Sequence, residues 1–291
     1  MLSLEGDVRE GSTFDADFHV LVHLAGALPR HFRTAPDDAH RVNLNGARQA
    51  AEACRRRGAR LVYVSTSGVY DRAARGALCE TASVGPISAY AESKLAAEHL
   101  CQQACAETVV VRLFNPYGPG QGEDMLIGQV LALAQAGREV VVRTPASRRD
   151  FIHVGDVAGA LLAVVMASTA PPPVLNVGSG VPARVADVVT FILGLLPHPV
   201  PVRWGADEAG DDAYADISLV LSALDWRPMV DLWQGVAALV EECHAPVSTS
   251  RSSNYEPLEQ FPLKRKLRKA RAALERPEAN SRAFPLRRKT L

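Results

Sequence analysis

The sequence of 291 residues has few cysteines, few aromatic residues and no long apolar run. Its five cysteines are too scattered to form a disulfide framework. No apolar stretch approaches the length of about 18 residues that a membrane-spanning helix needs. Residues 1–10 carry acidic groups where a secretory signal would have an apolar core. These absences predict a cytoplasmic protein with free thiols and no membrane partner.

Net charge is also absent, but its distribution is uneven. From Arg251 to Leu291 the chain has twelve Lys and Arg residues and four Glu residues, so this segment carries +8 and the rest carries −8. We therefore expect residues 246–291 to be a basic, disordered tail beside an acidic folded body. Binding of an anionic partner through Lys264–Arg271 is a second interpretation. The tail lacks the interleaved aromatic residues that stack on bases, so no nucleic-acid partner is predicted.

Apolar runs rich in β-branched residues alternate with helix-like segments in the first 115 residues. The runs are His19–Ala25, Leu61–Thr66 and Val109–Phe114, and the segments between them are Asp37–Arg57 and Ser88–Ala106. Short continuous apolar runs are typical of a parallel sheet that is covered on both faces. The alternation predicts an α/β fold with a doubly wound parallel sheet.

Shorter elements follow a loop rich in proline and glycine at residues 115–122. The sequence predicts helices over 125–137, 154–168, 184–196 and 232–244, and strands over 139–143 and 174–177.

Tyr90 and Lys94 are four residues apart near the start of the predicted helix over 88–106, which places them on one helix face. An ammonium beside a phenol favours the phenolate, so we expect Lys94 to lower the pKa of Tyr90 from about 10 toward neutrality. Such a tyrosine can take a proton from an alcohol and return it. Alone the pair is a weak indication, because a solvated helix face often carries this spacing by chance.

Three further sites strengthen this interpretation. Ser65 and Thr66 end an apolar strand, and ligands bind at the carboxyl ends of strands in such sheets. Asn43 lies in a predicted helix although its side chain disfavours helices. Arg149 is suited to bidentate phosphate recognition. Each also has an ordinary structural interpretation. Ser65 and Thr66 could simply form a turn, Asn43 could be an exposed polar residue, and Arg149 could form a surface ion pair with Asp150.

Nine motifs in a fixed order carry a resemblance to a known family. They are Gly6–Arg9, His23–Gly26, Asn43–Gly46, Ser65–Tyr70, Tyr90–Lys94, Arg112–Gly118, Arg149–Val154, Asn176–Gly180 and Asp225–Pro228. Over roughly residues 4–242 the chain resembles the extended short-chain dehydrogenase/reductase family, and within it the NAD-dependent nucleotide-sugar epimerases and dehydratases. The resemblance implies a Rossmann-like, N-terminally truncated dinucleotide-binding domain at 1–115, to which 150–177 return. It also implies a smaller substrate-binding domain, mainly at 116–245.

The resemblance implies a role for each matched residue. Tyr90 would be the catalytic acid and base, Lys94 its partner on the nicotinamide ribose, and Thr66 would hold the sugar hydroxyl. The remaining cofactor contacts would come from Asp7, Val8, Leu24, Ala25, Gly26, Asn43, Phe114 and Pro116, and the substrate diphosphate contacts from Asn115 and Arg149. NAD is the implied cofactor, with NADP also compatible, and no metal is implied. The implied partners are a nucleotide sugar and a second copy of the chain, paired through helices 37–57 and 88–106.

The residues after Thr66 distinguish between members of the family. Dehydratases carry Asp-Glu at this point and decarboxylating relatives keep the Glu, whereas this chain has Ser67 and Gly68. Without these carboxyl groups elimination loses its proton carriers. The resemblance therefore implies epimerisation through a transient 4-keto sugar, or simple alcohol and ketone redox chemistry.

The family's glycine-rich turn does not precede Gly6, which leaves a catalytically impaired fragment as an alternative. We then expect weak NAD binding and an edge strand at His19–Ala25. A second glycine pattern, Gly178–Ala183, follows a predicted strand and precedes a helix. A lone match of this kind is a weak fingerprint, and the order of the motifs places it near the substrate domain.

Overall fold

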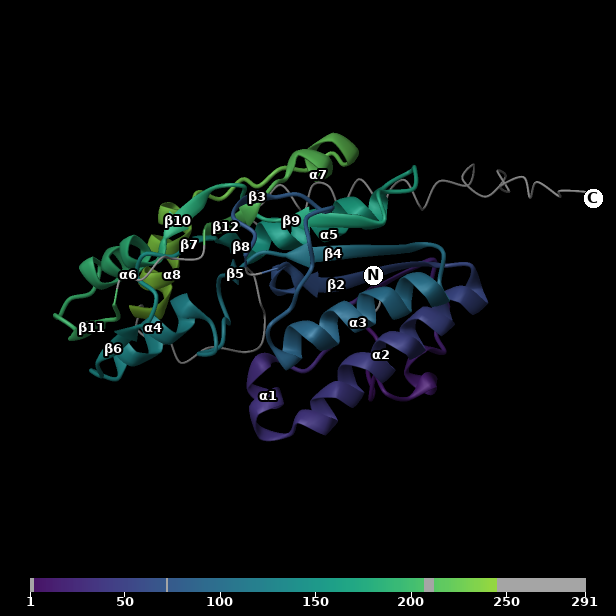
Figure 1. Ribbon diagram of the computed structural model, residues 1–291, viewed down its shortest axis with the longest axis horizontal. Helices are drawn as coiled ribbons and strands as arrows, with labels where there is room; N and C mark the ends of the chain where they lie inside the picture. Colours follow the sequence, from purple (N-terminus) through teal and green to yellow (C-terminus); the bar gives the residue numbers. More distant parts are fainter. Residues whose placement is uncertain (1–2, 72, 207–211, 245–291) are drawn as a thin grey trace, which may run out of the picture. The chain divides into compact units, whose positions relative to one another are not determined.

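The structure is a computed structural model that describes residues 3–71, 73–206 and 212–244 (Figure 1). The chain divides into two units, residues 1–245 and residues 246–291. The predicted basic tail and its segment Lys264–Arg271 lie outside the described residues.

A parallel sheet of four strands lies at the centre of the described unit. Its order is β1 (Val20–His23), β2 (Arg60–Thr66), β4 (Thr108–Leu113) and β9 (Val174–Val177). Every pairing in this order is parallel, so the predicted doubly wound α/β fold is confirmed. Within the described residues β1 lies at one edge of the sheet, as expected.

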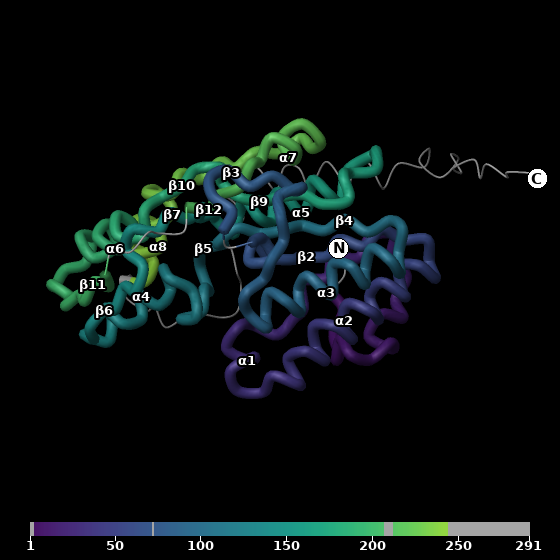
Figure 2. The backbone as a smooth tube through the Cα atoms, viewed as in Figure 1, coloured from purple at the N-terminus to yellow at the C-terminus, as the bar shows by residue number. Residues whose placement is uncertain are grey.

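Helices cover both faces of this sheet (Figures 1 and 2). Those on one face are α2 (Pro36–Arg57) and α3 (Ala89–Ala104), and those on the other are α5 (Val154–Met166) and α7 (Ser218–Ala223). Alternate residues of a strand face opposite sides of the sheet. Leu61 and Tyr63 of β2 therefore pack with α2 and α3, while Val62 and Val64 pack with α5. Burial on both faces explains the continuous apolar run in the sequence.

Local signals set the ends of the two helices that flank the candidate site. Gly58 has a φ of +62°, a left-handed conformation that favours glycine, and it ends α2. The side chain of Ser88 accepts a hydrogen bond of 3.2 Å from the amide of Ala91 at the start of α3. This cap places Tyr90 in the first turn of α3.

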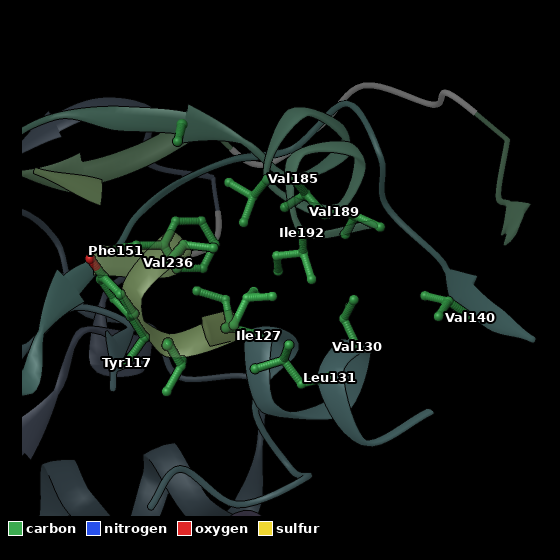
Figure 3. Packing of buried hydrophobic residues seen from close by; sticks show 14 of the residues in the cluster. Tyr117, Ile127, Val130, Leu131, Val140, Phe151, Val185, Val189, Ile192 and Val236 are labelled. Atoms are coloured by element: carbon green, nitrogen blue, oxygen red, sulfur yellow. The ribbon is translucent and has the colours of Figure 1, made fainter. Parts of the chain in front are cut away.

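The second part of the unit combines short strands with three helices. Four strands form one sheet in the order β10 (Pro182–Arg184), β7 (Arg148–Asp150), β12 (Asp212–Ala215) and β3 (Gly76–Leu78). Two further pairs are β11 (Val202–Trp204) with β6 (Val140–Val142), and β5 (Pro116–Tyr117) with β8 (Ile152–His153). The helices are α4 (Leu126–Gln135), α6 (Val185–Gly194) and α8 (Leu232–His244). Ile127, Ile192 and Val236 of these helices share one core (Figure 3). The domain boundary near residue 115 stays a prediction.

His23 of β1 is a buried histidine in the core beneath α2. It is 4% exposed, and its ring stacks on Tyr63 with centroids 5.9 Å apart. Its Nε2 atom is buried and has no hydrogen-bond partner among the described residues. Burial lowers the pKa of His23 to about 4, and the nearby charge of Lys94 acts in the same direction.

This histidine predicts a pH-dependent stability. The ordinary pKa of 6.5 applies in the unfolded chain, so the unfolded chain binds more protons than the folded one between pH 4 and 6.5. The contribution of His23 to the free energy of unfolding should be greatest above pH 6.5 and fall by up to about 3 kcal/mol as the pH drops to 4. Urea unfolding at several pH values should show a smaller acid-side loss for His23→Phe. Equal losses in both proteins would contradict the assignment.

Candidate active site

The predicted catalytic residues gather at the carboxyl edge of the parallel sheet. Thr66 ends β2, and Tyr90 and Lys94 lie in the first two turns of α3, which packs against β2 and the short turn after it. Leu24–Gly26 follow β1 and Phe114–Pro116 follow β4. Because these strands are parallel, the segments after them meet at one edge, where α/β proteins bind ligands.

Lys94 is buried between α3 and β2, with 6% of its surface exposed. Its Nζ atom donates a hydrogen bond of 2.6 Å to the carbonyl oxygen of Val64 and lies 4.3 Å from the centroid of the Tyr63 ring. Burial lowers the pKa of Lys94 to about 8, against the opposing effects of Cys101 and Glu98. The amine therefore titrates close to neutral pH.

Tyr90 differs from its predicted state. Burial raises the pKa of its phenol, so the predicted lowering by Lys94 is wrong in this structure. The reason is that the ammonium group of Lys94 binds Val64 and Tyr63. On its other side the Tyr90 ring meets Phe32 of α1 (Pro29–Thr34) edge-on, with centroids 5.9 Å apart. Tyr90 is thus a protonated phenol at neutral pH, and its ring packs against the apolar side chain of Phe32.

Thr66 keeps its hydroxyl proton available for a ligand. Its Oγ1 atom accepts a hydrogen bond of 3.1 Å from the amide of Gly68, which begins the turn after β2. The side chain is half-buried. A hydroxyl that accepts from the backbone can still donate to a substrate oxygen.

Asn43 joins two segments of the site. Its Oδ1 atom accepts a hydrogen bond of 2.7 Å from the amide of Ala27, and its Nδ2 atom donates a hydrogen bond of 2.8 Å to the hydroxyl of Ser93. Ser93 in turn donates 2.7 Å to the carbonyl of Tyr90. Asn43 is 2% exposed, so its unfavourable place in a helix is explained by these bonds between α2, α3 and the loop after β1.

Two of the residues expected to contact the cofactor, Asp7 and Val8, lie against α2. The carboxylate of Asp7 accepts hydrogen bonds of 2.9 Å from Arg9, which also pairs with Asp38 at 2.7 Å. Arg9 holds the pKa of Asp7 at about 2. Val8 packs closely on Gly46 of α2.

The residues expected at the substrate diphosphate lie where β7 meets the end of β4. The side-chain amide of Asn115 donates a hydrogen bond of 2.8 Å to the carbonyl of Asp150. The main-chain carbonyl of Asn115 accepts a hydrogen bond of 3.2 Å from the amide of Ile152. Arg149 precedes Asp150 in β7 and is half-buried. These bonds bring Arg149 to the same end of the sheet as Thr66.

The second glycine pattern binds a carboxylate of the protein. Asp150 is fully buried, and its side chain accepts from the amide and hydroxyl of Ser179 at 2.7 and 2.6 Å, from the amide of Gly180 at 2.9 Å and from the amide of Ala215 at 3.1 Å. A side chain at Gly178 would collide with Asp150. The amides that a dinucleotide phosphate would need are therefore occupied, and the fingerprint interpretation does not hold.

One buried ion pair near the candidate site was not predicted from the sequence. Glu98 of α3 and Arg112 of β4 form a buried ion pair of 2.7 Å directly below the site. The signal for it was present, because Arg112 interrupts an otherwise apolar strand and Glu98 follows Lys94 by one helical turn.

Two features are absent from the described residues 3–71, 73–206 and 212–244. No three His, Cys, Asp or Glu side chains gather there in a way that could hold a metal ion. No helix in those ranges has both the length and the apolar character needed to cross a membrane.

Comparison with known proteins adds to this geometry. The model of the NAD dependent epimerase/dehydratase family matches residues 4–178. The UDP-glucose 4-epimerase of Streptomyces lividans is 32% identical over 254 residues, which cover 77% of each chain. An uncharacterized UDP-glucose epimerase of Bacillus subtilis is 28% identical over 232 residues, which cover 75% of this chain and 72% of the relative. The structure of MoeE5 in complex with UDP-glucose and NAD superposes with a TM-score of 0.73 at 29% identity, over 82% of this chain and 84% of that chain.

The range that the family model matches contains Thr66, Tyr90 and Lys94. The matches confirm the resemblance that the nine motifs indicate, and the chain therefore belongs to the NAD-dependent epimerase/dehydratase family.

Proposed function

We propose that this protein is an NAD-dependent epimerase-type oxidoreductase that acts on a nucleotide-diphosphate sugar. The observation that carries the proposal is the meeting of Thr66, Tyr90 and Lys94 at the carboxyl edge of one parallel sheet. The Streptomyces lividans relative is named a UDP-glucose 4-epimerase, and the MoeE5 structure contains UDP-glucose and NAD. These names favour a UDP-hexose as the first substrate to test.

The residues at this edge fit the nicotinamide end of NAD, the cofactor of the family. Lys94 offers ammonium donors, and the half-buried Pro116 offers an apolar surface two residues after the buried Phe114. Leu24 is 64% exposed where β1 ends, and Gly26 beside it has little room for a side chain, because a Cβ atom would lie 3.0 Å from Asn43 Oδ1. One similar structure, at 26% identity and a TM-score of 0.72, contains NADPH, so both dinucleotides belong in the assay.

The protein's own residues would handle the proton and the orientation of the sugar. NAD, when bound, accepts a hydride from the sugar carbon and returns it. The hydroxyl of Thr66 would orient the C4 hydroxyl, and Tyr90 in its phenolate form would take the proton of that hydroxyl and later return it to the turned 4-keto sugar. Because burial raises the pKa of Tyr90, this step needs a cation beside the phenol. Lys94 has a flexible four-carbon side chain. Its ammonium group would therefore be able to leave the carbonyl of Val64 and lower the pKa of the Tyr90 phenol.

The first test is turnover by the full chain. Purified protein with NAD should interconvert UDP-glucose and UDP-galactose, followed by proton NMR of the anomeric signals. Tyr90→Phe should lower kcat by about 10²- to 10⁴-fold, since it removes the proton carrier. Tyr214→Phe, which changes a tyrosine of β12, should leave kcat unchanged. Weak NAD binding by calorimetry together with no turnover would support the catalytically impaired alternative and overturn the proposed activity.

The second test separates epimerisation from elimination and decarboxylation. Ser67 and Gly68 hold no carboxyl group, although a Cβ atom at Gly68 would lie 3.5 to 3.7 Å from its neighbours Thr66 and Ala91, which is ordinary contact. The protein with NAD should release no carbon dioxide from UDP-glucuronic acid. Gly68→Ala should fold and keep the epimerase rate close to that of the parent. Carbon dioxide release by the parent would contradict the assignment to epimerisation.

We also propose a homodimer that pairs through α2 and α3. The exposed stripe of α2 carries Arg41, Arg48 and Arg55, while that of α3 carries Glu92, so a two-fold arrangement can place Glu92 of one chain beside an arginine of the other. Light scattering should give the mass of two chains at low salt. Because salt screens exposed charges, the dimer should weaken in about 1 M salt and in Arg48→Glu. A monomer at low salt would contradict this interface.

A further inference from the structure

A buried ion pair lies below the candidate site and has no part in the proposed chemistry. Glu98 of α3 and Arg112 of β4 are 1% and 6% exposed. Arg112 Nη2 donates 2.7 Å to Glu98 Oε2, and its Nε lies 3.2 Å from both carboxylate oxygens. The two-pronged geometry fixes the orientation of both side chains as well as their distance.

The carboxylate of Glu98 joins α3 to the residue before Thr66. Ser65 donates its hydroxyl proton to Glu98 Oε1. One helical turn earlier, Lys94 donates to the carbonyl of Val64. Two successive residues of β2 are therefore held by two side chains on one face of α3. Thr66 follows them directly, and Tyr90 lies one turn before Lys94 on the same helix.

The guanidinium of Arg112 extends this contact to other strand ends. Its Cζ atom lies 4.8 Å from the centroid of the Tyr70 ring, and Tyr70 packs beside Phe114 with centroids 6.2 Å apart. The hydroxyl of Tyr70 donates 2.7 Å to Asn176 of β9. The ion pair thus contacts Ser65, which precedes Thr66, and Tyr70, which packs beside Phe114.

We propose that Glu98 and Arg112 are positioning residues for catalysis, which set the separation between Thr66 on β2 and Tyr90 on α3. The proposal rests on the proposed function. A buried ion pair is a poor source of stability, because burial removes both charges from water and apolar residues of similar volume often serve as well. Its geometry, in contrast, specifies where α3 lies along β2. Proton transfer between a sugar hydroxyl and a phenol is sensitive to displacements of about 1 Å.

The test removes the pair without leaving a lone buried charge. The double variant Glu98→Leu/Arg112→Met should fold with a thermal midpoint close to that of the parent. Its kcat for the epimerisation should fall at least about tenfold while KM stays within about twofold. Arg112→Lys, which keeps the charge but loses the two-pronged geometry, should recover part of kcat.

A matched control is the exposed pair of Glu139 and Arg203, which are joined at 3.1 Å with side chains 46% and 66% exposed. Glu139→Ala/Arg203→Ala should leave both kcat and KM unchanged. A folded Glu98→Leu/Arg112→Met protein with the parent's kcat would overturn the proposal. If that variant does not fold, Ser65→Ala decides, because it cuts the contact of Glu98 with β2 alone. A parent-like kcat in Ser65→Ala would then overturn the proposal.

Hydrogen exchange separates this inference from the proposed activity. If the parent has no turnover, the proposed function fails, and the positioning role is read from amide exchange at 65–68 and 89–93. These amides should exchange at least about tenfold faster in Glu98→Leu/Arg112→Met, with β9 unchanged. Equal exchange in both proteins would overturn the positioning role on its own.

Discussion

The contact between helix α3 and strand β2 is the interaction on which the candidate site depends. It is made by charged side chains in an apolar core, where Lys94 reaches the carbonyl of Val64 and Glu98 reaches the hydroxyl of Ser65. Polar groups without partners are costly in such a place, so each bond excludes alternative positions of the helix along the strand. The phenol and the threonine hydroxyl inherit their separation from this contact.

The same burial sets the electrostatics of the site. A low-dielectric environment favours the uncharged form of every group, so it raises the pKa of Tyr90 and lowers those of Lys94 and His23. A tyrosine base and an ammonium partner can coexist there only when they face each other. The apolar packing that stabilises the fold therefore makes the site's acid–base chemistry depend on which way one lysine points.

The sequence was sufficient for the long elements and for the family of the protein. Val109–Phe114 and Asp37–Arg57 follow the patterns of a buried strand and a helix, and the structure has them within a residue or two. Strands such as β3 and β7 have three residues each, too few for any periodicity, and they exist because distant segments offer hydrogen bonds. The partners of Asp150, 29 or more residues away along the chain, and the bond of Lys94 to Val64 are products of tertiary packing, which spacing alone does not encode.

The backbone conformation at Gly68 does not require a glycine. Its φ lies outside the left-handed region, and a Cβ atom there would lie 3.5 to 3.7 Å from Thr66 and Ala91, which is ordinary van der Waals contact. A methyl group can therefore be added beside the candidate site with the strand, the turn and the helix all left in place. Under the proposed function, the groups that select the reaction are separable from the architecture that supports it.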